Sequence, residues 1–157
     1  MTIRQACEAE LERILDMYDA MHAVLTGEYG YPFALERERN AEFMRAQIKS
    51  KMARVLVAEA AGGELVGFLH GTISRGDRRY TLGGESTAGR VEAVYAEEGA
   101  RGTGAADALM DAAEQWFRAE GVTIAEAYIV RGNERSTRFH ARHGFEEIAT
   151  RVVKQIK

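Results

Sequence analysis

A glycine-rich run at residues 101–106 offers the clearest chemistry in this sequence. It reads Arg101-Gly102-Thr103-Gly104-Ala105-Ala106 and opens a long amphipathic segment. The first amides of a helix have no partners within the helix, and they carry the positive end of its dipole. Small residues also let an anion approach the backbone closely. The run therefore predicts an anion site, and pyrophosphate is the occupant that we expect.

Two well-known phosphate-binding motifs do not describe this run. The dinucleotide-binding fingerprint needs three glycines spaced G-x-G-x-x-G, with an acidic residue about 20 positions further on. A Walker A loop needs a lysine followed by serine or threonine, and the run lacks that pair. Ordinary packing of a loop against a helix explains such a run equally well. The elements on either side of the run must therefore show whether it is an anion site.

Two further side chains could move protons. Glu92 interrupts an apolar stretch from Val91 to Val94, and His140 lies near the end of a short helical segment. A carboxylate can serve as a general base, and an imidazole changes its charge near neutral pH. Two structural alternatives stay open. Glu92 could be an exposed strand residue or an ion-pair partner, and His140 could simply pack within its helix.

Composition indicates one soluble globular domain spanning residues 1–157. Apolar residues make up 46% of the chain and charged residues 29%, which are ordinary values for such a domain. The formal net charge of −3 argues against nucleic acid as a partner. No apolar run approaches the ~18 residues of a membrane span, and the N-terminus lacks the apolar core of a signal peptide. We therefore expect a cytoplasmic protein that binds neither nucleic acid nor membrane.

Cysteine and histidine usage argues against a metal site. Cys7 is the only cysteine, so neither an internal disulfide nor a cysteine zinc cluster can form. We expect Cys7 to be a buried structural thiol. The histidines His22, His70 and His143 share no ligand spacing, and no metal is expected.

Periodicity and turn residues predict a mixed order of strands and helices. Strands are expected at 2–6, 55–60, 65–73, 90–96 and 122–130, with a final strand or strand pair at 145–156. Helices are expected from residue 11 to a stop at Gly27, and at 35–50, 104–120 and 134–143. The polar loop 74–89 could hold a short strand at Tyr80–Leu82. Because a helix separates strands 90–96 and 122–130, these two should lie parallel, joined by a right-handed crossover.

Two motifs stand at matching positions around this strand–helix–strand–helix unit. The first is the run 101–106, which fits the pattern Arg/Gln-x-x-Gly-x-Gly/Ala. The second reads Asn133-x-x-Ser136-x-x-Phe139-His140-x-x-x-Gly144-Phe145, similar to Asn-x-x-Ala-x-x-Phe-Tyr-x-x-x-Gly-Phe. Together they resemble the GNAT superfamily of acetyl-CoA-dependent N-acetyltransferases. The resemblance implies an α/β fold, with a mixed central sheet, about four flanking helices and splayed parallel central strands.

The resemblance also implies roles for individual residues, with acetyl-CoA as co-substrate. Val94 and Ala96 would offer backbone groups to the pantetheine arm like an added strand. Amides of the run 101–106 would hold the pyrophosphate, while Asn133 would bind the pantetheine and Phe139 would pack beside it. The full expected set is Val94, Tyr95, Ala96, Arg101, Gly102, Thr103, Gly104, Ala105, Ala106, Asn133, Ser136 and Phe139.

The implied reaction is direct acetyl transfer from the thioester to a primary amine of a small molecule or peptide. Glu92 is our candidate base. It should share a face with Val94 and Ala96 along a period-two strand, unless the strand carries a bulge. His140 stands where most family members place a tyrosine acid, and Tyr95 and Tyr128 are alternative acids.

A narrower resemblance points to the aminoglycoside 6'-N-acetyltransferase branch. It rests on Arg79-Tyr80-x-x-Gly83, Val91-Glu92-x-Val94-Tyr95, Asn133-x-x-Ser136-x-x-x-His140, and Gly144-Phe145-Glu146-Glu147-x-x-x-Arg151-Val152-Val153. This chain departs from the branch at Tyr128, where an aspartate is usual. A non-catalytic acyl-CoA-binding sensor is another alternative, and family habit implies a homodimer. Tyr29, Tyr31 and Phe33 could shape the acceptor channel or anchor a loop. The basic residues Arg75, Arg78 and Arg79 could be solvated, or could meet the cofactor or an acidic acceptor.

Overall fold

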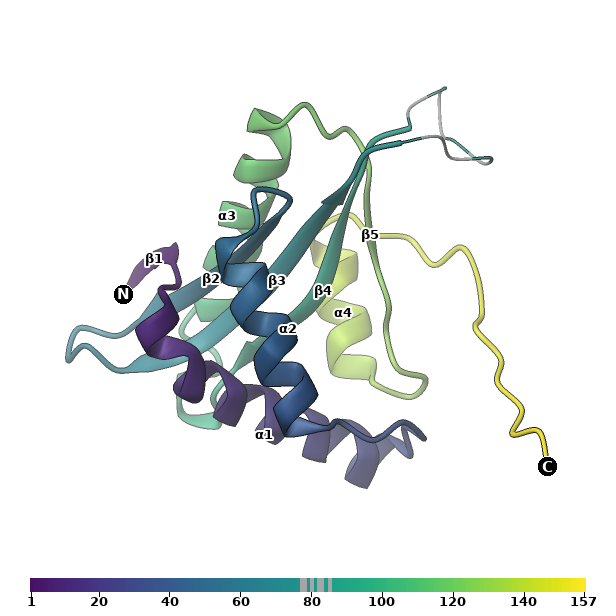
Figure 1. The fold of residues 1–157 in the computed structure, drawn as a ribbon, viewed down its shortest axis with the longest axis horizontal. Helices are drawn as coiled ribbons and strands as arrows, with labels where there is room; N and C mark the ends of the chain where they lie inside the picture. The colour runs from purple at the N-terminus through teal and green to yellow at the C-terminus, as the bar shows by residue number, and fades with distance from the viewer. Residues whose placement is uncertain (77–78, 80, 82–83, 85) are drawn as a thin grey trace.

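Five strands form one mixed sheet with helices on both faces (Figure 1). The computed structural model describes residues 1–76, 79, 81, 84 and 86–157. Arg78, Tyr80, Leu82 and Gly83, and with them the short strand expected at Tyr80–Leu82, lie outside the described residues. The strands are β1 (Thr2–Gln5), β2 (Ala53–Glu59), β3 (Leu65–Ser74), β4 (Ala88–Ala96) and β5 (Ala125–Ala127). The helices are α1 (Leu11–Tyr29), α2 (Arg37–Lys49), α3 (Ala105–Ala119) and α4 (Glu134–Arg142), with short 3-10 turns η1 (Glu8–Glu10) and η2 (Glu98–Ala100).

The strand order in the sheet follows the order in the chain. β1, β2, β3 and β4 pair antiparallel, whereas β4 and β5 pair parallel. The parallel arrangement that the intervening helix predicted is confirmed. Two antiparallel strands can be joined by a tight turn, but a parallel pair needs a crossover, and α3 supplies it.

Two apolar clusters hold the helices to opposite faces of the sheet. α1 and α2 cover one face through a cluster that includes Ile14, Met44 and Phe68. α3 covers the other face through a cluster that includes Leu109 and Trp116, and Phe139 of α4 packs against that same cluster. The two faces of the sheet therefore carry separate apolar clusters, one under α1 and α2 and the other under α3 and α4.

Glycines with positive φ set two helix ends, and one of them lies later than the sequence indicated. α1 continues through Gly27 and ends at Gly30, whose φ of 64° is left-handed and whose amide bonds to the carbonyl of Leu25. The predicted stop at Gly27 is therefore wrong, because a left-handed glycine terminates a helix whereas one with helical φ only weakens it. The predicted end of α3 at Gly121 is confirmed, with φ of 74°.

Two strands expected near the end of the chain differ from the structure. β5 has three residues rather than the nine expected at 122–130, and residues 145–157, which we name the tail, contain no strand. A strand requires a neighbour that takes its backbone hydrogen bonds. β5 pairs with β4 only from Ala125 to Ala127, and the tail pairs with none of the described strands. Figure 1 shows the tail (yellow) running away from the sheet.

The expectation for Cys7 is also wrong, because its side chain is exposed. Cys7 is the residue that precedes η1, and its amide donates to the Glu10 carboxylate at 2.9 Å. The buried residue of this segment is its neighbour Ala6. Position at the start of a turn, rather than side-chain polarity, thus decides which of the two faces solvent.

We expect two glycine-to-alanine substitutions to change stability in opposite directions. A Cβ at Gly89 would lie 2.7 Å from the Phe117 ring, so Gly89→Ala should lower the free energy of unfolding by about 1–3 kcal/mol. Gly27 is helical, and a Cβ at this position would meet open space, so Gly27→Ala should raise it by about 0.5–1 kcal/mol. Urea denaturation measures both. Equal changes in the two variants would contradict this packing.

Candidate functional site

A β-bulge in β4 determines where Glu92 points. His70 of β3 lies opposite Ala93, but the next residue, Gly71, lies opposite Val91, so Glu92 is the extra residue. A bulge of this kind re-aims side chains relative to the regular alternation. Val94 and Ala96 face the α3 cluster, whereas Glu92 faces the side of α1 and α2. The simple expectation of one shared face is therefore wrong, and the alternative with a bulge is the one observed.

The exposed carboxylate of Glu92 is held by one neighbouring side chain. The Thr72 hydroxyl of β3 donates to Glu92 Oε1 at 2.8 Å. Tyr18 of α1 is close enough to respond to the same charge: burial of its hydroxyl, together with Glu92, raises the pKa of Tyr18 above its ordinary value. Glu92 thus sits on the strand, oriented by Thr72 and facing α1.

A buried polar network lies beneath this carboxylate. His70 is 1% exposed, and its two ring nitrogens meet partners from two helices. The Nε2–H donates to Gln47 Oε1 of α2 at 2.8 Å, and Nδ1 accepts from the Tyr18 hydroxyl at 3.2 Å. Burial lowers the pKa of His70 to about 4, which keeps the ring neutral near neutral pH. The network ties α1, α2 and β3 together behind Glu92.

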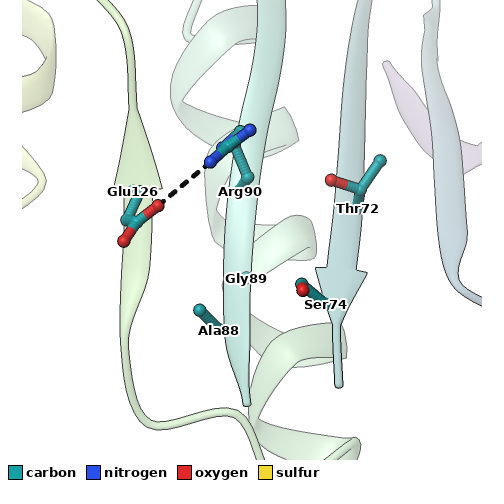
Figure 2. A pocket seen from close by; sticks show the side chains of 6 residues that line it. All are labelled: Thr72, Ser74, Ala88, Gly89, Arg90 and Glu126. Atoms are coloured by element: carbon teal, nitrogen blue, oxygen red, sulfur yellow. Dashed lines mark hydrogen bonds and ion pairs between the residues drawn. The ribbon is translucent and has the colours of Figure 1, made fainter. Parts of the chain in front are cut away.

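A small polar cavity lies beside Thr72, the residue that holds the Glu92 carboxylate (Figure 2). It has a volume of about 150 Å³ and is lined by Thr72, Ser74, Ala88, Gly89, Arg90 and Glu126. Arg90 pairs with Glu126 across β4 and β5 at 3.3 Å, and its guanidinium lies 5.2 Å from the centre of the Tyr128 ring. Arg90 Nε is buried without a hydrogen-bond partner in the described part of the chain. A ligand oxygen in this cavity could satisfy that donor.

The parallel strands β4 and β5 stop pairing at the bulge. Pairing between β4 and β5 ends at Val91 and Ala127, whereas β4 continues to Ala96, bonded to β3 on its other edge. The β4 backbone at residues 94–96 therefore faces β5 without a strand partner among the described residues. An extended chain that carries amide groups could pair with this edge in the manner of an added strand.

The glycine-rich run lies just after this open edge. Gly102 and Gly104 have φ of 77° and 84°, and a Cβ built at either glycine meets open space. The first helical bond of α3 joins the Ala108 amide to the Gly104 carbonyl at 2.9 Å. Amides of Ala105 and Ala106 consequently have no partner among the described residues. Ala105 is 1% exposed and Ala106 is half-buried, and their small side chains would let a phosphate come close to the backbone at this turn.

A carboxylate near these amides carries its own counter-charges. Asp107 in the first turn of α3 accepts from His143 Nε2 at 2.9 Å and from Arg142 at 2.9 Å. Burial raises the pKa of Asp107, but the hydrogen bonds from His143 and Arg142 outweigh it and the pKa is lowered. The pairing therefore fastens the end of α4 to the start of α3. It also offsets a negative charge that would repel a phosphate.

The residues expected on α4 occupy mainly structural positions. Asn133 caps the helix, because its Oδ1 accepts from the Ser136 amide at 3.1 Å. His140 is 4% exposed, its ring lies between Phe139 and Phe145, and burial lowers its pKa. Nδ1 of His140 lies 2.8 Å from the Ser136 carbonyl. A carbonyl only accepts, so Nδ1 carries the proton of the neutral ring and Nε2 carries none.

Aromatic residues line the loop between α1 and α2. The Tyr31 ring meets Phe33 at 5.4 Å and His22 at 6.0 Å between centres, in edge-to-face geometry. Of the alternative acids, Tyr95 is half-buried against Phe68, and burial raises its pKa. Tyr128 is exposed beside Arg90. The loop therefore presents an aromatic surface near the end of α1.

Several residues of the site had no signal in the sequence. Thr72, Tyr18 and Gln47 act through contacts that join β3 to β4, α1 and α2, and only the folded chain brings them together.

The structure gives Arg75 a partner within the chain. Arg75 pairs with Glu120 at 3.0 Å, so the position of its side chain is explained without a phosphate contact. Within the described residues, no group of three or more potential ligands could hold a metal ion, and no helix is long and apolar enough to cross a membrane.

Comparison with known proteins gives a consistent set of relatives. The model of the acetyltransferase (GNAT) family matches residues 16–145. An aminoglycoside N(6')-acetyltransferase type 1 of Klebsiella aerogenes is 36% identical over 112 residues, which is 69% of either chain. The apo structure of the 6'-N-acetyltransferase AAC(6')-IG of Acinetobacter haemolyticus superposes with a TM-score of 0.79, at 22% identity, over 100% of this chain and 99% of that one. AAC(6')-Iy in complex with CoA gives 0.75, at 18% identity, over 99% of each chain. At these identities the two structures establish the fold.

Neutral His70 makes a prediction for the pH dependence of stability. Its pKa is about 4 in the folded chain but about 6.5 when unfolded, so only the unfolded chain gains a proton between these values. The free energy of unfolding should therefore fall as pH drops from 6.5 toward 4. His70→Phe should show a smaller fall over that window. Urea denaturation at several pH values measures this, and identical slopes in both proteins would contradict a neutral buried His70.

Proposed function

The chain belongs to the GNAT family and is an N-acetyltransferase, and we propose that its acceptor amine reaches Glu92 on the face of the sheet that α1 and α2 cover. The observation that carries the proposal is the bulge in β4, which turns Glu92 away from the side occupied by Val94 and Ala96. Acetyl-CoA and the amine can then approach the same strand from different directions.

Acetyl-CoA would lie along the open edge of β4. The chain fits it at two points: the unpaired backbone at residues 94–96 for the pantetheine amides, and the amides of Ala105 and Ala106 for the pyrophosphate. The left-handed glycines Gly102 and Gly104 hold the run in the conformation that presents these amides. We propose that Asn133 and Phe139 support this site by fixing the start and packing of α4, rather than by direct recognition alone.

Proton removal is the task of the acceptor side. A primary amine has a pKa of about 10.4, so nearly all of it is protonated near neutral pH and cannot attack. In our proposal the Glu92 carboxylate takes that proton, directly or through a water, while Thr72 keeps the carboxylate oriented. The amine nitrogen then bonds to the acetyl carbon, the carbon–sulfur bond breaks, and CoA leaves as a thiolate. The nitrogen releases its second proton to solvent as the bond forms, and the thiolate takes up a proton from solvent, so that the products are an acetamide and CoA with a free thiol.

His140 contributes to packing in this proposal, and the acid role that the resemblance implied is weakened. Its neutral ring has no proton on Nε2, and burial disfavours the doubly protonated form. A thiolate with a pKa near 8.5, by analogy with cysteine, can be protonated by solvent at neutral pH.

An aminoglycoside is the acceptor that specific observations favour among amines. The relative from Klebsiella aerogenes, named for this activity, is 36% identical over 112 residues. Glu92 lies on the acceptor face, where a polyamine sugar would bring positive charges, and the sugar's hydroxyl oxygens could meet Arg90 Nε in the cavity, which has no hydrogen-bond partner among the described residues. Small-molecule amines and peptides remain the broader class. We also propose that the enzyme is a homodimer. We expect it to act in the cytoplasm, where acetyl-CoA is available.

Glu92→Gln should lower kcat by about 100-fold or more, because a general base contributes roughly 10²–10⁴-fold. Acetyl-CoA affinity should stay unchanged. His140→Phe should change kcat by no more than about threefold, because His140 serves packing in this proposal. Removal of a general acid would instead lower kcat by roughly 10²–10⁴-fold.

The assay for both variants follows CoA release with a panel of aminoglycosides, polyamines and peptides. Turnover limited to non-sugar amines would exclude the aminoglycoside. Acetyl-CoA binding with no turnover of any amine would favour the sensor.

Substitutions at Gly104 test the phosphate-binding run. Its φ of 84° is strained for valine but accessible to asparagine. Gly104→Val should weaken acetyl-CoA binding at least tenfold in calorimetric titration, and Gly104→Asn should retain most of it. Circular dichroism serves as the folding control. Unchanged binding in a folded Gly104→Val protein would contradict the assignment of the pyrophosphate to this run.

A further inference from the structure

The hydroxyl group of Tyr18 has one hydrogen bond, and the network behind it fixes the direction of its proton. Its partner in the described part of the chain is Nδ1 of His70, at 3.2 Å. The other ring nitrogen, Nε2, lies 2.8 Å from Gln47 Oε1, which can only accept. Because burial lowers the pKa of His70 to about 4, the ring is neutral, and its single proton lies on Nε2. Nδ1 therefore accepts from Tyr18, whose oxygen keeps lone pairs to offer and no proton to give.

This oxygen and the Glu92 carboxylate lie over neighbouring positions on one face of β3. A Cβ at Gly71 would meet the α3 side of the sheet, so His70 and Thr72 on either side of it point to the face under α1 and α2. Two residues of a strand span about 6–7 Å. His70 holds the Tyr18 hydroxyl, and Thr72 holds Glu92 Oε1. The second carboxylate oxygen of Glu92 has no hydrogen-bond donor among the residues that the structure describes.

Two neighbouring acceptors of this kind favour a ligand with several protons. Glu92 is exposed and Tyr18 is half-buried, at the border between the apolar cluster under α1 and α2 and solvent. A protonated primary amine has three N–H donors, whereas a hydroxyl group has a single proton. An amine can therefore bond to both oxygens at once, and an alcohol can donate to only one of them. The charge of Glu92 adds a preference for the ammonium form.

We propose that Tyr18 is a second acceptor for the reacting amine: its oxygen binds one N–H while the Glu92 carboxylate binds another, and the pair selects an amine over an alcohol. The inference rests on the proposed function, which brings the amine to Glu92. When Glu92 removes its proton, the N–H held by Tyr18 keeps the nitrogen in place, with its lone pair free to attack. His70 and Gln47 are positioning residues, because they fix the direction of the Tyr18 proton.

Neomycin and paromomycin are matched probes for this site, since paromomycin carries a hydroxyl group in place of the 6'-amino group of neomycin. Calorimetric titration without acetyl-CoA measures their affinities. Tyr18→Phe should weaken neomycin binding about tenfold or more, because a hydrogen bond to a charged group is lost. It should change paromomycin binding by less than about twofold, because the single proton of that hydroxyl goes to Glu92. Met21→Leu is the matched control: it alters an apolar side chain of α1 on the same cluster, and both affinities should stay unchanged.

Gln47→Leu tests the direction of the network. Without its acceptor, the His70 ring can take the other neutral form, with the proton on Nδ1. That proton would occupy a lone pair of Tyr18 and turn the tyrosine proton outward. Neomycin should again lose affinity while paromomycin does not, and an unchanged ratio of the two affinities would contradict the fixed direction.

The same measurements separate a recognition role of Tyr18 from a structural one. Equal losses for both probes, or unchanged neomycin binding in a Tyr18→Phe protein that circular dichroism shows to be folded, would overturn the inference. If Glu92→Gln keeps full turnover, the amine does not meet Glu92, and the proposed function fails together with this inference. If Glu92→Gln loses turnover while Tyr18→Phe leaves neomycin binding unchanged, only this inference fails.

Discussion

One extra residue in β4 gives that strand two separate tasks. Before the bulge, β4 is paired on both edges; after it, the edge toward β5 is open. The bulge also sends the Glu92 side chain toward α1 and α2, while Val94 and Ala96 turn to the α3 cluster. A regular strand would have placed Glu92 and Val94 on one face, where a base would compete for space with the packed cluster. In the proposed function, the irregularity thus separates the carboxylate that would meet an amine from the backbone that would meet a thioester.

The elements around β4 keep this arrangement rigid from both sides. On the face under α1 and α2, the neutral ring of His70 joins Tyr18 of α1 to Gln47 of α2, so both helices hold a fixed position over the sheet. On the opposite face, Asp107 joins the first turn of α3 to the end of α4. Buried polar networks of this kind are stable only when their members are satisfied.

Local chemistry made much of this fold readable in the sequence. The glycine-rich run and the parallel strands on either side of α3 follow from spacing and periodicity, whereas the family follows from the resemblance of two motifs to known acetyltransferases. The structure confirms the parallel pairing, and the relatives confirm the family. The sequence allowed either a regular or a bulged β4, because a bulge is a register shift between two strands rather than a residue type. Thr72 and Tyr18 were missed for the same reason: their roles arise from contacts across the sheet. The strand expected in the tail was wrong, because β propensity cannot say whether a partner edge is present.

A crystal structure with CoA bound would test the central claim most directly. The pyrophosphate should lie within hydrogen-bond distance of the Ala105 and Ala106 amides. The thiol should lie at the point where β4 and β5 diverge, with the Glu92 carboxylate facing it from the side of α1 and α2. A CoA molecule bound away from the start of α3, or a Glu92 side chain turned to the α3 side, would contradict it.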